Sequence, residues 1–329
     1  MLYNIIASTI INQYQCRGSQ QSVGMLMIIL IILPLMKDTE DFKSGFVNII
    51  GRPNVGKSTL LNALMKEKLA ITSSKAQTTR HRMFGILNDD NYQIVFSDTP
   101  GAIDPAYKLQ EKMMGYVRTA LDDADVILFM VALEDKNEYP QLIEMAQNAH
   151  APVIFLINKT DLNKGSQTFD KTAYWKELYP DLEIMSVSAL EEHGTNELMD
   201  RILELLPHHP PFFPEDEITD KSERFICAEI IREKIFINYK QEIPYSSEVV
   251  VTSFKEDEKI INIEAEIFVE RDSQKGIIIG KKAESIKKVG MQARKDMEAF
   301  FGKKIHLQTF VKVEKDWRKD DRKLSRFGY

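Results

Sequence analysis

The chain has 329 residues, of which 43% are hydrophobic and 28% are charged. This length is enough for two or three domains, and this composition is typical of a soluble globular protein. The chain contains only two cysteines, Cys16 and Cys227, which excludes a disulfide framework and a cysteine metal site and indicates a reducing, cytoplasmic setting.

The net charge of −6 is distributed unevenly along the chain. Residues 1–219 carry 19 basic and 29 acidic side chains, a balance of −10, whereas residues 220–329 carry 24 and 20, a balance of +4. The last 55 residues alone carry 16 basic and 7 acidic side chains. This basic end predicts a polyanionic partner, and the alternative is an ordinary solvated surface.

The first 43 residues include an apolar run from Val23 to Met36. This run is shorter than the roughly 20 residues that a membrane span needs, and no small-residue cleavage site follows it. We therefore expect residues 1–43 to be an extension that is disordered or that results from a start assigned too early, with synthesis beginning at Met36. The alternative is a weak peripheral membrane anchor.

Five apolar runs follow between Gly45 and Leu206, and they read FVNIIG, YQIVFSDTPG, ADVILFMVAL, APVIFLINKTD and LEIMSVSAL. The runs lack polar alternation, as do parallel strands that are covered on both faces. Amphipathic stretches with a helical period separate them. The sequence therefore predicts a doubly wound α/β domain over residues 44–206.

Four prolines between Pro207 and Asp216 end this pattern and predict a semi-rigid linker over residues 207–219. A helical stretch, two strands rich in Val and Ile, further helical sequence and a final strand then predict a small α+β domain over residues 220–315. Residues 316–329 form a basic tail with interleaved Trp, Phe and Tyr. We expect this tail to add stacking and phosphate contacts to a nucleic acid or, alternatively, to pack on the domain.

The segment GRPNVGKS links the first predicted strand to the following helix. Its Gly-x4-Gly-Lys-Ser spacing, met by Gly51, Gly56, Lys57 and Ser58, predicts a phosphate-binding loop at a helix N-terminus. Lys57 should reach the β and γ phosphates, and the Ser58 hydroxyl should hold Mg²⁺. The other predicted nucleotide-binding residues of this loop are Arg52, Pro53, Asn54 and Val55.

Two further motifs lie at predicted strand ends. The first is Asp98-Thr99-Pro100-Gly101. Its acid, Asp98, can hold magnesium through water, and the N–H of Gly101 can contact the γ phosphate. All four residues are predicted to belong to the nucleotide site.

The third motif, Asn158-Lys159-Thr-Asp161, offers a carboxylate that accepts from the N1–H and exocyclic amine of guanine. The aliphatic stem of Lys159 can cover the base. The backbone at Ser188 and Ala189 can meet the guanine oxygen. Together the motifs predict GTP, with GDP as product, rather than ATP.

These motifs, together with QTTRHR at residues 77–82, the linker and the C-terminal α+β unit, resemble the Era family of GTPases from roughly Gly45 to the C-terminus. The resemblance implies a P-loop GTPase domain followed by a KH-type (type II) RNA-binding domain. It further implies binding of 16S rRNA near its 3′ end during assembly of the small (30S) ribosomal subunit. We expect the protein to be a monomer.

The family resemblance also bears on the chemistry. We expect Lys57, Asp98 and Gly101 to act in catalysis together with Thr79, whose hydroxyl should join Ser58 on Mg²⁺. Ala102 and Ile103 follow Gly101 and neither can orient water, so intrinsic hydrolysis should be slow. The resemblance suggests K⁺, held partly by Asn54, as a further catalytic ion.

The predicted RNA-binding loop comprises Gly280, Lys281 and Lys282, followed by Ala283 where a Gly-x-x-Gly loop would have glycine. A positive φ at Ala283 would cost about 1 kcal/mol or more. Two other functions compete with this interpretation: a P-loop kinase or ATPase that uses the tail as a lid, and a membrane-associated signalling GTPase that uses the apolar run near residue 30.

Overall fold

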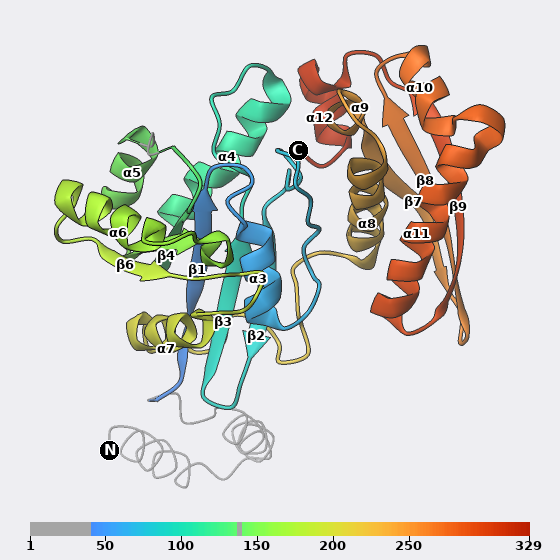
Figure 1. The fold of residues 1–329 in the computed structure, drawn as a ribbon. Helices are drawn as coiled ribbons and strands as arrows, with labels where there is room; N and C mark the ends of the chain where they lie inside the picture. The colour runs from blue at the N-terminus through green and yellow to red at the C-terminus, as the bar shows by residue number, and fades with distance from the viewer. Residues whose placement is uncertain (1–40, 137–139) are drawn as a thin grey trace, which may run out of the picture.

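The computed structural model describes residues 41–136 and 140–329, which form two domains that lie side by side (Figure 1). The expectations for the apolar run between Val23 and Met36 fall outside these residues. Within the described ranges, no helix combines the length and the apolar character that crossing a bilayer requires.

The N-terminal domain is built on a six-stranded sheet with strand order β2-β3-β1-β4-β5-β6. Its elements are β1 (Lys43–Gly51), α3 (Lys57–Met65), β2 (Met83–Asn88), β3 (Tyr92–Asp98), α4 (Lys108–Asp122), β4 (Val126–Ala132), α5 (Pro140–Gln147), β5 (Val153–Asn158), a 3-10 turn η2 (Thr160–Leu162), α6 (Gln167–Leu178), β6 (Glu183–Ser186) and α7 (Thr195–Leu205).

Helices cover both faces of this sheet, which explains the unbroken apolar runs of its strands. Leu128 and Met130 of β4 pack in the cluster that contains α3 and α7. Ile127 and Phe129, the alternate residues, pack in the cluster that contains α4, α5 and α6. Because successive side chains of a strand point to opposite faces, both sets must be apolar. The predicted doubly wound α/β architecture is confirmed.

All five predicted strands are present, but the prediction missed a sixth, β2, which pairs antiparallel with β3. Its run MFGILN is short and interrupted by Gly85, so it resembles a loop. Since β2 lies at the edge of the sheet, its outer backbone groups need other partners. The amide of Ile86 donates to the Ile218 carbonyl at 2.9 Å, and the amide of Phe84 donates to Asp220 Oδ1 at 2.8 Å.

The Pro-rich segment 207–219 is therefore held against the first domain along much of its length. Gln93 Oε1 of β3 accepts from the amides of Phe212 and Phe213 at 2.6 and 2.9 Å. The ring of Phe212 packs on that of Phe46, with centroids 4.9 Å apart. The segment protects the sheet edge as well as connecting the two domains.

The C-terminal domain has a three-stranded sheet in the order β7-β8-β9. Strand β8 is antiparallel to β7 and parallel to β9. The elements are α8 (Glu223–Asn238), α9 (Ile243–Ser246), β7 (Glu248–Glu256), β8 (Ile260–Val269), α10 (Asp272–Ile279), a 3-10 turn η3 (Lys281–Ala283), α11 (Glu284–Phe301) and β9 (Lys304–Val313). The predicted small α+β domain is confirmed.

The basic tail folds into a 3-10 turn η4 (Trp317–Lys319) and α12 (Asp321–Arg326). Trp317 and Leu324 are fully buried against Leu109 and Met113 of α4. Trp317 Nε1 donates to the Ser246 carbonyl at 3.0 Å. Of the two expectations for the tail, packing is correct. Stacking of RNA bases on Trp317 is wrong, because the indole fills the junction between the domains.

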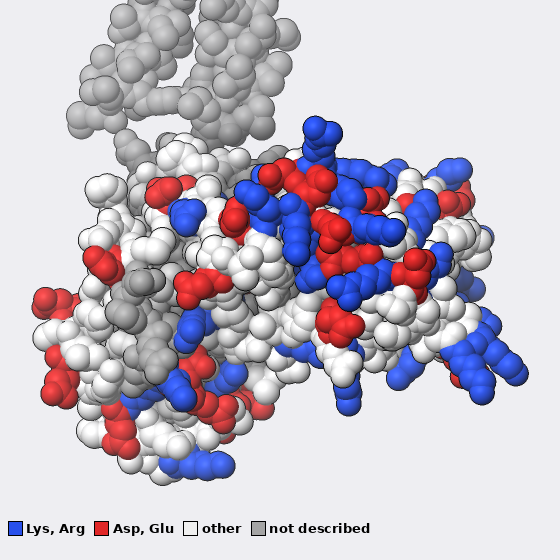
Figure 2. Space-filling view, turned by 90° about the horizontal axis from the view of Figure 1, so that it is seen from above, with Lys and Arg blue, Asp and Glu red and all other residues white. Residues whose placement is uncertain are grey.

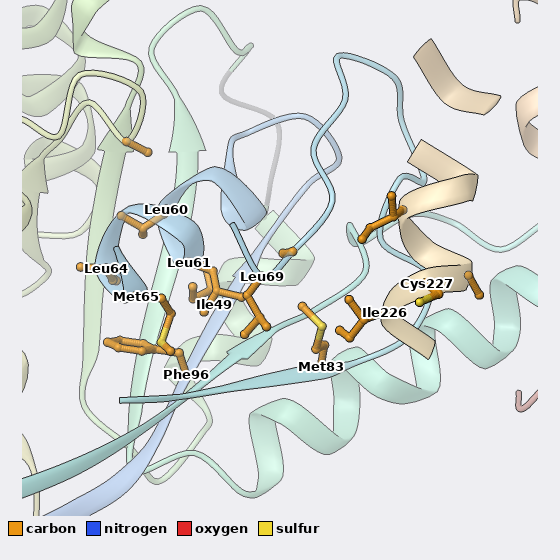
Figure 3. Close-up of a cluster of buried hydrophobic side chains, with 14 of the residues drawn as sticks. Ile49, Leu60, Leu61, Leu64, Met65, Leu69, Met83, Phe96, Ile226 and Cys227 are labelled. Atoms are coloured by element: carbon orange, nitrogen blue, oxygen red, sulfur yellow. The ribbon is translucent and has the colours of Figure 1, made fainter. Parts of the chain in front are cut away.

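The two domains also share one apolar core. Leu61 of α3 and Leu69 lie in the same cluster of buried side chains as Ile226 and Cys227 of α8, and Figure 3 shows Met83 of β2 between the two groups. Burial of a side chain of this size contributes about 1.5–3 kcal/mol. The contact between the domains therefore resembles a domain interior.

Candidate functional site

The phosphate loop connects β1 to α3 at the carboxyl end of the sheet. Gly56 caps α3 with a left-handed φ of 104°, and a Cβ there would lie 2.3 Å from Asn158 Nδ2. Only glycine meets both conditions. Val55 is buried beneath the loop, while Arg52 and Asn54 are exposed, Asn54 with a φ of 65°. The loop is thus fixed from below and open above.

Helix α3 begins without a side-chain cap and without an acidic residue in its first turn, so its N-terminal N–H groups suit an anion. The Nζ of Lys57 donates to the carbonyls of Gly51 and Arg52 at 3.1 and 3.0 Å. Burial lowers the pKa of Lys57 to about 8, although the nearby Asp98 opposes this change. A phosphate at the helix start would favour the charged lysine.

Three side-chain oxygens converge beside Lys57. Ser58 Oγ donates to Asp98 Oδ2 at 2.6 Å and lies 2.9 Å from Thr79 Oγ1, which in turn donates to Asp98 Oδ2 at 3.0 Å. Asp98 Oδ1 is buried and has no hydrogen-bond partner. Burial raises the pKa of Asp98, although Lys57 and the two hydroxyls oppose the rise. A hard cation with oxygen ligands would compensate this buried carboxylate, so the residues fit Mg²⁺.

The segment after β3 packs directly on the phosphate loop. A Cβ at Gly101 would lie 2.6 Å from the backbone nitrogen of Pro53, so glycine allows the close approach. Thr99 Oγ1 donates to the Ile49 carbonyl at 2.7 Å, and Pro100 is buried beside it. Residues 98–101 therefore lie directly against the phosphate loop.

The loops after β5 and β6 lie on the other side of the phosphate loop. Asn158 Nδ2 donates to the Val55 carbonyl at 2.8 Å, and Asn158 Oδ1 accepts from the Ala189 amide at 2.9 Å. Ser188 Oγ donates to Asp161 Oδ1 at 2.6 Å. Asn158 thus acts as a structural link between the loops, while Asp161 is exposed to solvent.

A cavity of about 500 Å³ opens above these groups. The residues that line it include several predicted site residues, among them Pro53, Lys57, Ser58, Thr79, Gly101 and Lys159. The opposite wall includes Gln77 and Thr78, which belong to the QTTRHR segment noted in the sequence. The rest of this wall was not predicted and is formed by Ile71, Thr72, Ser73, Ser74 and Lys75. This wall carries no regular element between Ala70 and Arg82, and no sequence motif marks it before Gln77.

The predicted RNA-binding residues lie in the other domain, in the turn between α10 and α11. Gly280 has a φ of 71°, and a Cβ there would lie 2.2 Å from Ser285 Oγ. Lys282 and Ala283 are also left-handed, with φ of 51° and 61°. The positive φ at Ala283 carries the strain expected for a non-glycine residue. Lys281 and Lys282 are exposed.

Basic side chains are concentrated on this half of the molecule, where acidic side chains are interleaved with them (Figure 2). Exposed Lys281, Lys282, Lys287 and Lys288 follow one another around the turn and the first part of α11. Such a group can contact successive phosphates of a nucleic acid.

Two residues that join the two domains at the site were not predicted from the sequence. Arg80 is fully buried, and its guanidinium bonds to residues 244–248 of the C-terminal domain. His81 stacks on Tyr329 with ring centroids 4.1 Å apart. No local pattern could identify these contacts, because more than 160 residues separate Arg80 from its partners.

Comparison with known families supports both domains. A family model described as "50S ribosome-binding GTPase" matches residues 46–159, and one described as "KH domain" matches residues 242–318. GTPase Era of Geotalea uraniireducens (strain Rf4) is 47% identical over 293 residues, which are 88% of this chain and 99% of that protein. GTPase Era of Clostridium kluyveri (strain NBRC 12016) is 41% identical over 290 residues, 87% of this chain and 99% of that protein.

Two solved structures are also similar over most of the chain. One is Era in complex with MgGDPNP and nucleotides 1506–1542 of 16S ribosomal RNA, with 39% identity and a TM-score of 0.83 over 88% of this chain and 99% of that one. The other is a variant of Aquifex aeolicus Era bound to GDP.AlF4−, with the same identity, TM-score and coverage.

Proposed function

Since the chain belongs to the Era family of GTPases, we propose that it couples GTP binding and hydrolysis to the binding of 16S rRNA near its 3′ end, in assembly of the 30S subunit. The chain is a GTP-hydrolysing enzyme with a P-loop GTPase domain and a KH domain. The observation that carries the proposal is the similarity to an Era structure that holds both MgGDPNP and a 16S rRNA segment.

For the phosphates, we assign binding to the loop from Gly51 to Ser58 and to the N-terminus of α3. Lys57 would exchange its bonds to the Gly51 and Arg52 carbonyls for phosphate oxygens, which is a small movement of a buried side chain. Gly101, held against Pro53, would direct its N–H at the γ phosphate. This arrangement supports stabilisation of the charge that develops during phosphoryl transfer.

For the metal, we assign Ser58 and Thr79 as ligands of Mg²⁺ and Asp98 as the acid that holds it, directly or through water. The convergence of their oxygens within 3.0 Å supports this assignment. When bound, the ion neutralises phosphate charge and orients the β and γ phosphates. Thr79 belongs to a segment without regular structure. The rest of the protein must therefore hold Thr79 near Ser58 if both are to bind the ion.

For the base, Asp161 would accept from the N1–H and exocyclic amine of guanine, while Lys159 covers one face of the ring. The hydroxyl of Ser188 fixes Asp161, and the Ala189 amide is fixed by Asn158. These contacts support selection of GTP over ATP, because adenine would leave the carboxylate without a donor.

For hydrolysis, the residues after Gly101 are Ala102, which is buried, and Ile103, and neither has a polar side chain. We therefore propose a slow intrinsic rate and a K⁺ ion partly held by Asn54, which is exposed at the top of the phosphate loop. A cation there would offset transition-state charge. Hydrolysis should accordingly be faster in KCl than in NaCl at equal ionic strength, and Asn54→Ala should remove this difference.

We further propose that the protein works as a monomer in the cytoplasm. The alternative function, a membrane-associated signalling GTPase, depends on the apolar run within residues 23–36, which lies outside the described residues.

One experiment tests the proposal as a whole. Purified chain would be titrated into a labelled RNA that ends in the 3′ segment of 16S rRNA, with GDPNP, GDP or no nucleotide. We expect tight binding that depends on the nucleotide and is competed by unlabelled 16S segment more strongly than by an unrelated RNA of equal length. Equal competition by both RNAs, or RNA binding that is the same with GDPNP, GDP and no nucleotide, would contradict the proposal.

A further inference from the structure

Arg80 and Thr79 are neighbours in the chain, but their side chains serve different domains. We propose that Arg80 is a positioning residue for the magnesium ligand Thr79, and that the KH domain holds Arg80 in place through Glu248 and Tyr329. The KH domain would then be a structural part of the GTPase site. This inference rests on the proposed GTP and magnesium site.

The guanidinium of Arg80 lies entirely within the KH domain. Its Nη1 donates to the Ser247 carbonyl at 2.7 Å and to Glu248 Oε2 at 2.9 Å. Its Nη2 donates to the carbonyls of Pro244 and Tyr245 at 2.9 and 3.2 Å. The Arg80 side chain is fully buried, so water cannot replace these bonds without opening the interface. Four acceptors from residues 244–248 thus fix the position of Arg80.

The carboxylate that receives Arg80 is itself fixed. Glu248 Oε2 accepts a 2.6 Å hydrogen bond from the Tyr329 hydroxyl, and Glu248 Oε1 accepts from the Val249 amide at 3.1 Å. Burial alone would raise the pKa of Glu248, but the charges of Arg80 and Arg232 hold it below its ordinary value. The carboxylate is therefore ionised at neutral pH and keeps its bond to Arg80.

Tyr329 closes the arrangement from the opposite side. Its ring stacks on His81, the residue that follows Arg80, with an interplanar angle of 21°. The Gly328 carbonyl accepts from the hydroxyl of Tyr116 in α4 at 3.4 Å. In the segment 79–81, Thr79 thus lies at the proposed magnesium site, the guanidinium of Arg80 bonds to the KH domain, and the ring of His81 stacks on the C-terminal residue Tyr329.

This geometry leaves Thr79 little freedom of its own. The described segment from Ala70 to Arg82 forms no helix or strand, so backbone pairing does not hold Thr79 in place. The Thr79 hydroxyl must lie within about 3 Å of Ser58 Oγ to share an ion with it, and the anchored Arg80 limits its displacement. If the KH domain moved relative to the sheet, Arg80 would carry Thr79 away from the magnesium site.

The coupling must act in both directions, because a free energy that links two sites is reciprocal. A γ phosphate and Mg²⁺ that hold Thr79 should stabilise the Arg80–Glu248 contact, whereas GDP, which has no γ phosphate, should depend on that contact much less. A substitution that breaks the Arg80–Glu248 contact is thus expected to weaken the binding of GTP analogues more than the binding of GDP.

The test measures affinity for GDPNP and for GDP, each as a function of Mg²⁺ concentration, in the full chain. Arg80→Gln should weaken GDPNP binding about tenfold relative to GDP, within the usual range for coupling between sites. It should also raise the Mg²⁺ concentration needed for GDPNP binding. Tyr329→Phe removes one hydroxyl and keeps Arg80, so it should weaken GDPNP binding relative to GDP to a smaller extent. This second variant keeps the inference testable if Arg80→Gln does not fold.

Lys68→Gln is the matched control. Lys68 also crosses the interface, to Glu233 at 2.9 Å and Asp296 at 3.3 Å, but it does not adjoin Thr79. Its GDPNP-to-GDP affinity ratio should equal that of the wild type. An unchanged ratio in Arg80→Gln and Tyr329→Phe, or an equal change in Lys68→Gln, would overturn the inference. Failure of the wild type to bind GDPNP would instead overturn the proposed function.

Discussion

Ser188 Oγ donates a 2.6 Å hydrogen bond to Asp161 Oδ1, although 27 residues separate them in the chain. Ser188 is fully buried, whereas Asp161 is exposed. The bond fixes one oxygen of the carboxylate and leaves the other available to a ligand. Ser188 therefore acts on the base indirectly, by orienting the group that reads it.

Asp161→Asn should weaken GTP binding by about 10³-fold, since the amide presents a donor where guanine also presents donors. The same variant should bind xanthosine triphosphate better than the wild type does, because xanthine carries a carbonyl in place of the exocyclic amine. Ser188→Ala should weaken GTP binding only about tenfold, in keeping with loss of one charge-assisted hydrogen bond. Nucleotide competition against labelled GDP measures all three affinities.

Asp170→Asn provides a control for the loss of one negative charge from an exposed aspartate of the same domain. Asp170 is exposed in α6 and bonds to Ser166, away from the phosphate loop. It should leave the preference for guanine unchanged. A wild-type preference in Asp161→Asn would show that another group selects the base.

Much of the nucleotide site could be predicted because its residues follow fixed rules of local chemistry. Gly56 must be glycine for its φ of 104°, and Lys57 must follow it to reach a phosphate at the helix start. The doubly wound sheet was predictable for a similar reason, since β4 and β5 are apolar on both faces. Parallel strands then bring their carboxyl ends, and hence the motifs, to one edge.

The remainder depends on contacts that no local rule specifies. Strand β2 is a short run whose edge is completed by residues near Ile218. Trp317 belongs to a tail whose basic and aromatic composition is typical of a segment that stacks on RNA. It is nevertheless buried, because it packs on the apolar side chains of Leu109 and Met113 in α4. Arg80 looks like an ordinary basic residue until the KH domain surrounds it. Each case requires knowledge of a partner distant in sequence.

Replacing Ala283 by glycine should stabilise the protein. Ala283 has a φ of 61°, which costs about 1 kcal/mol for a residue with a Cβ. Glycine would remove this strain, but its greater entropy in the unfolded chain would offset part of the gain in stability. We expect a net increase of about 0.5 kcal/mol in the free energy of unfolding, measured by urea denaturation. Gly280→Ala should have the opposite effect, because its Cβ would lie 2.2 Å from Ser285 Oγ. A loss of stability in Ala283→Gly would refute this account of the turn.

The Glu248 carboxylate should make the free energy of unfolding depend on pH in the acidic range. Its folded pKa lies below the ordinary value of 4.5, despite burial, because Arg80 and Arg232 stabilise the charge. The ionised group therefore stabilises the folded state fully above pH 4.5, and this contribution is lost as the pH falls below 4.5 through the folded pKa. Glu248→Gln should be less stable at pH 7 and should lose stability less steeply than the wild type as the pH falls below 4.5. Parallel pH curves for variant and wild type would contradict the assignment.

Cys227 should report on the contact between the domains. Burial, together with Glu223, raises its pKa to about 12, and the side chain lies in the core shared with α3. At pH 8 it should therefore react with an aromatic disulfide at least about 10³-fold more slowly than a free thiol. The measurement uses Cys16→Ser, so that Cys227 is the only thiol, and the same chain in urea should react rapidly. Fast labelling of the folded chain would show that the domains separate readily.

Lys281 and Lys282 should contribute to RNA binding mainly through charge. Replacing both by glutamine should weaken RNA binding and reduce the slope of log affinity against log salt by about 0.7 per lysine, the value for one phosphate contact on a single strand. The measurement is RNA affinity at several KCl concentrations with GDPNP present. Lys259→Gln controls for charge, since Lys259 is exposed in the turn between β7 and β8. If Lys259→Gln reduced the slope as much as each loop lysine does, the RNA would be held by general surface charge rather than by the turn at Gly280.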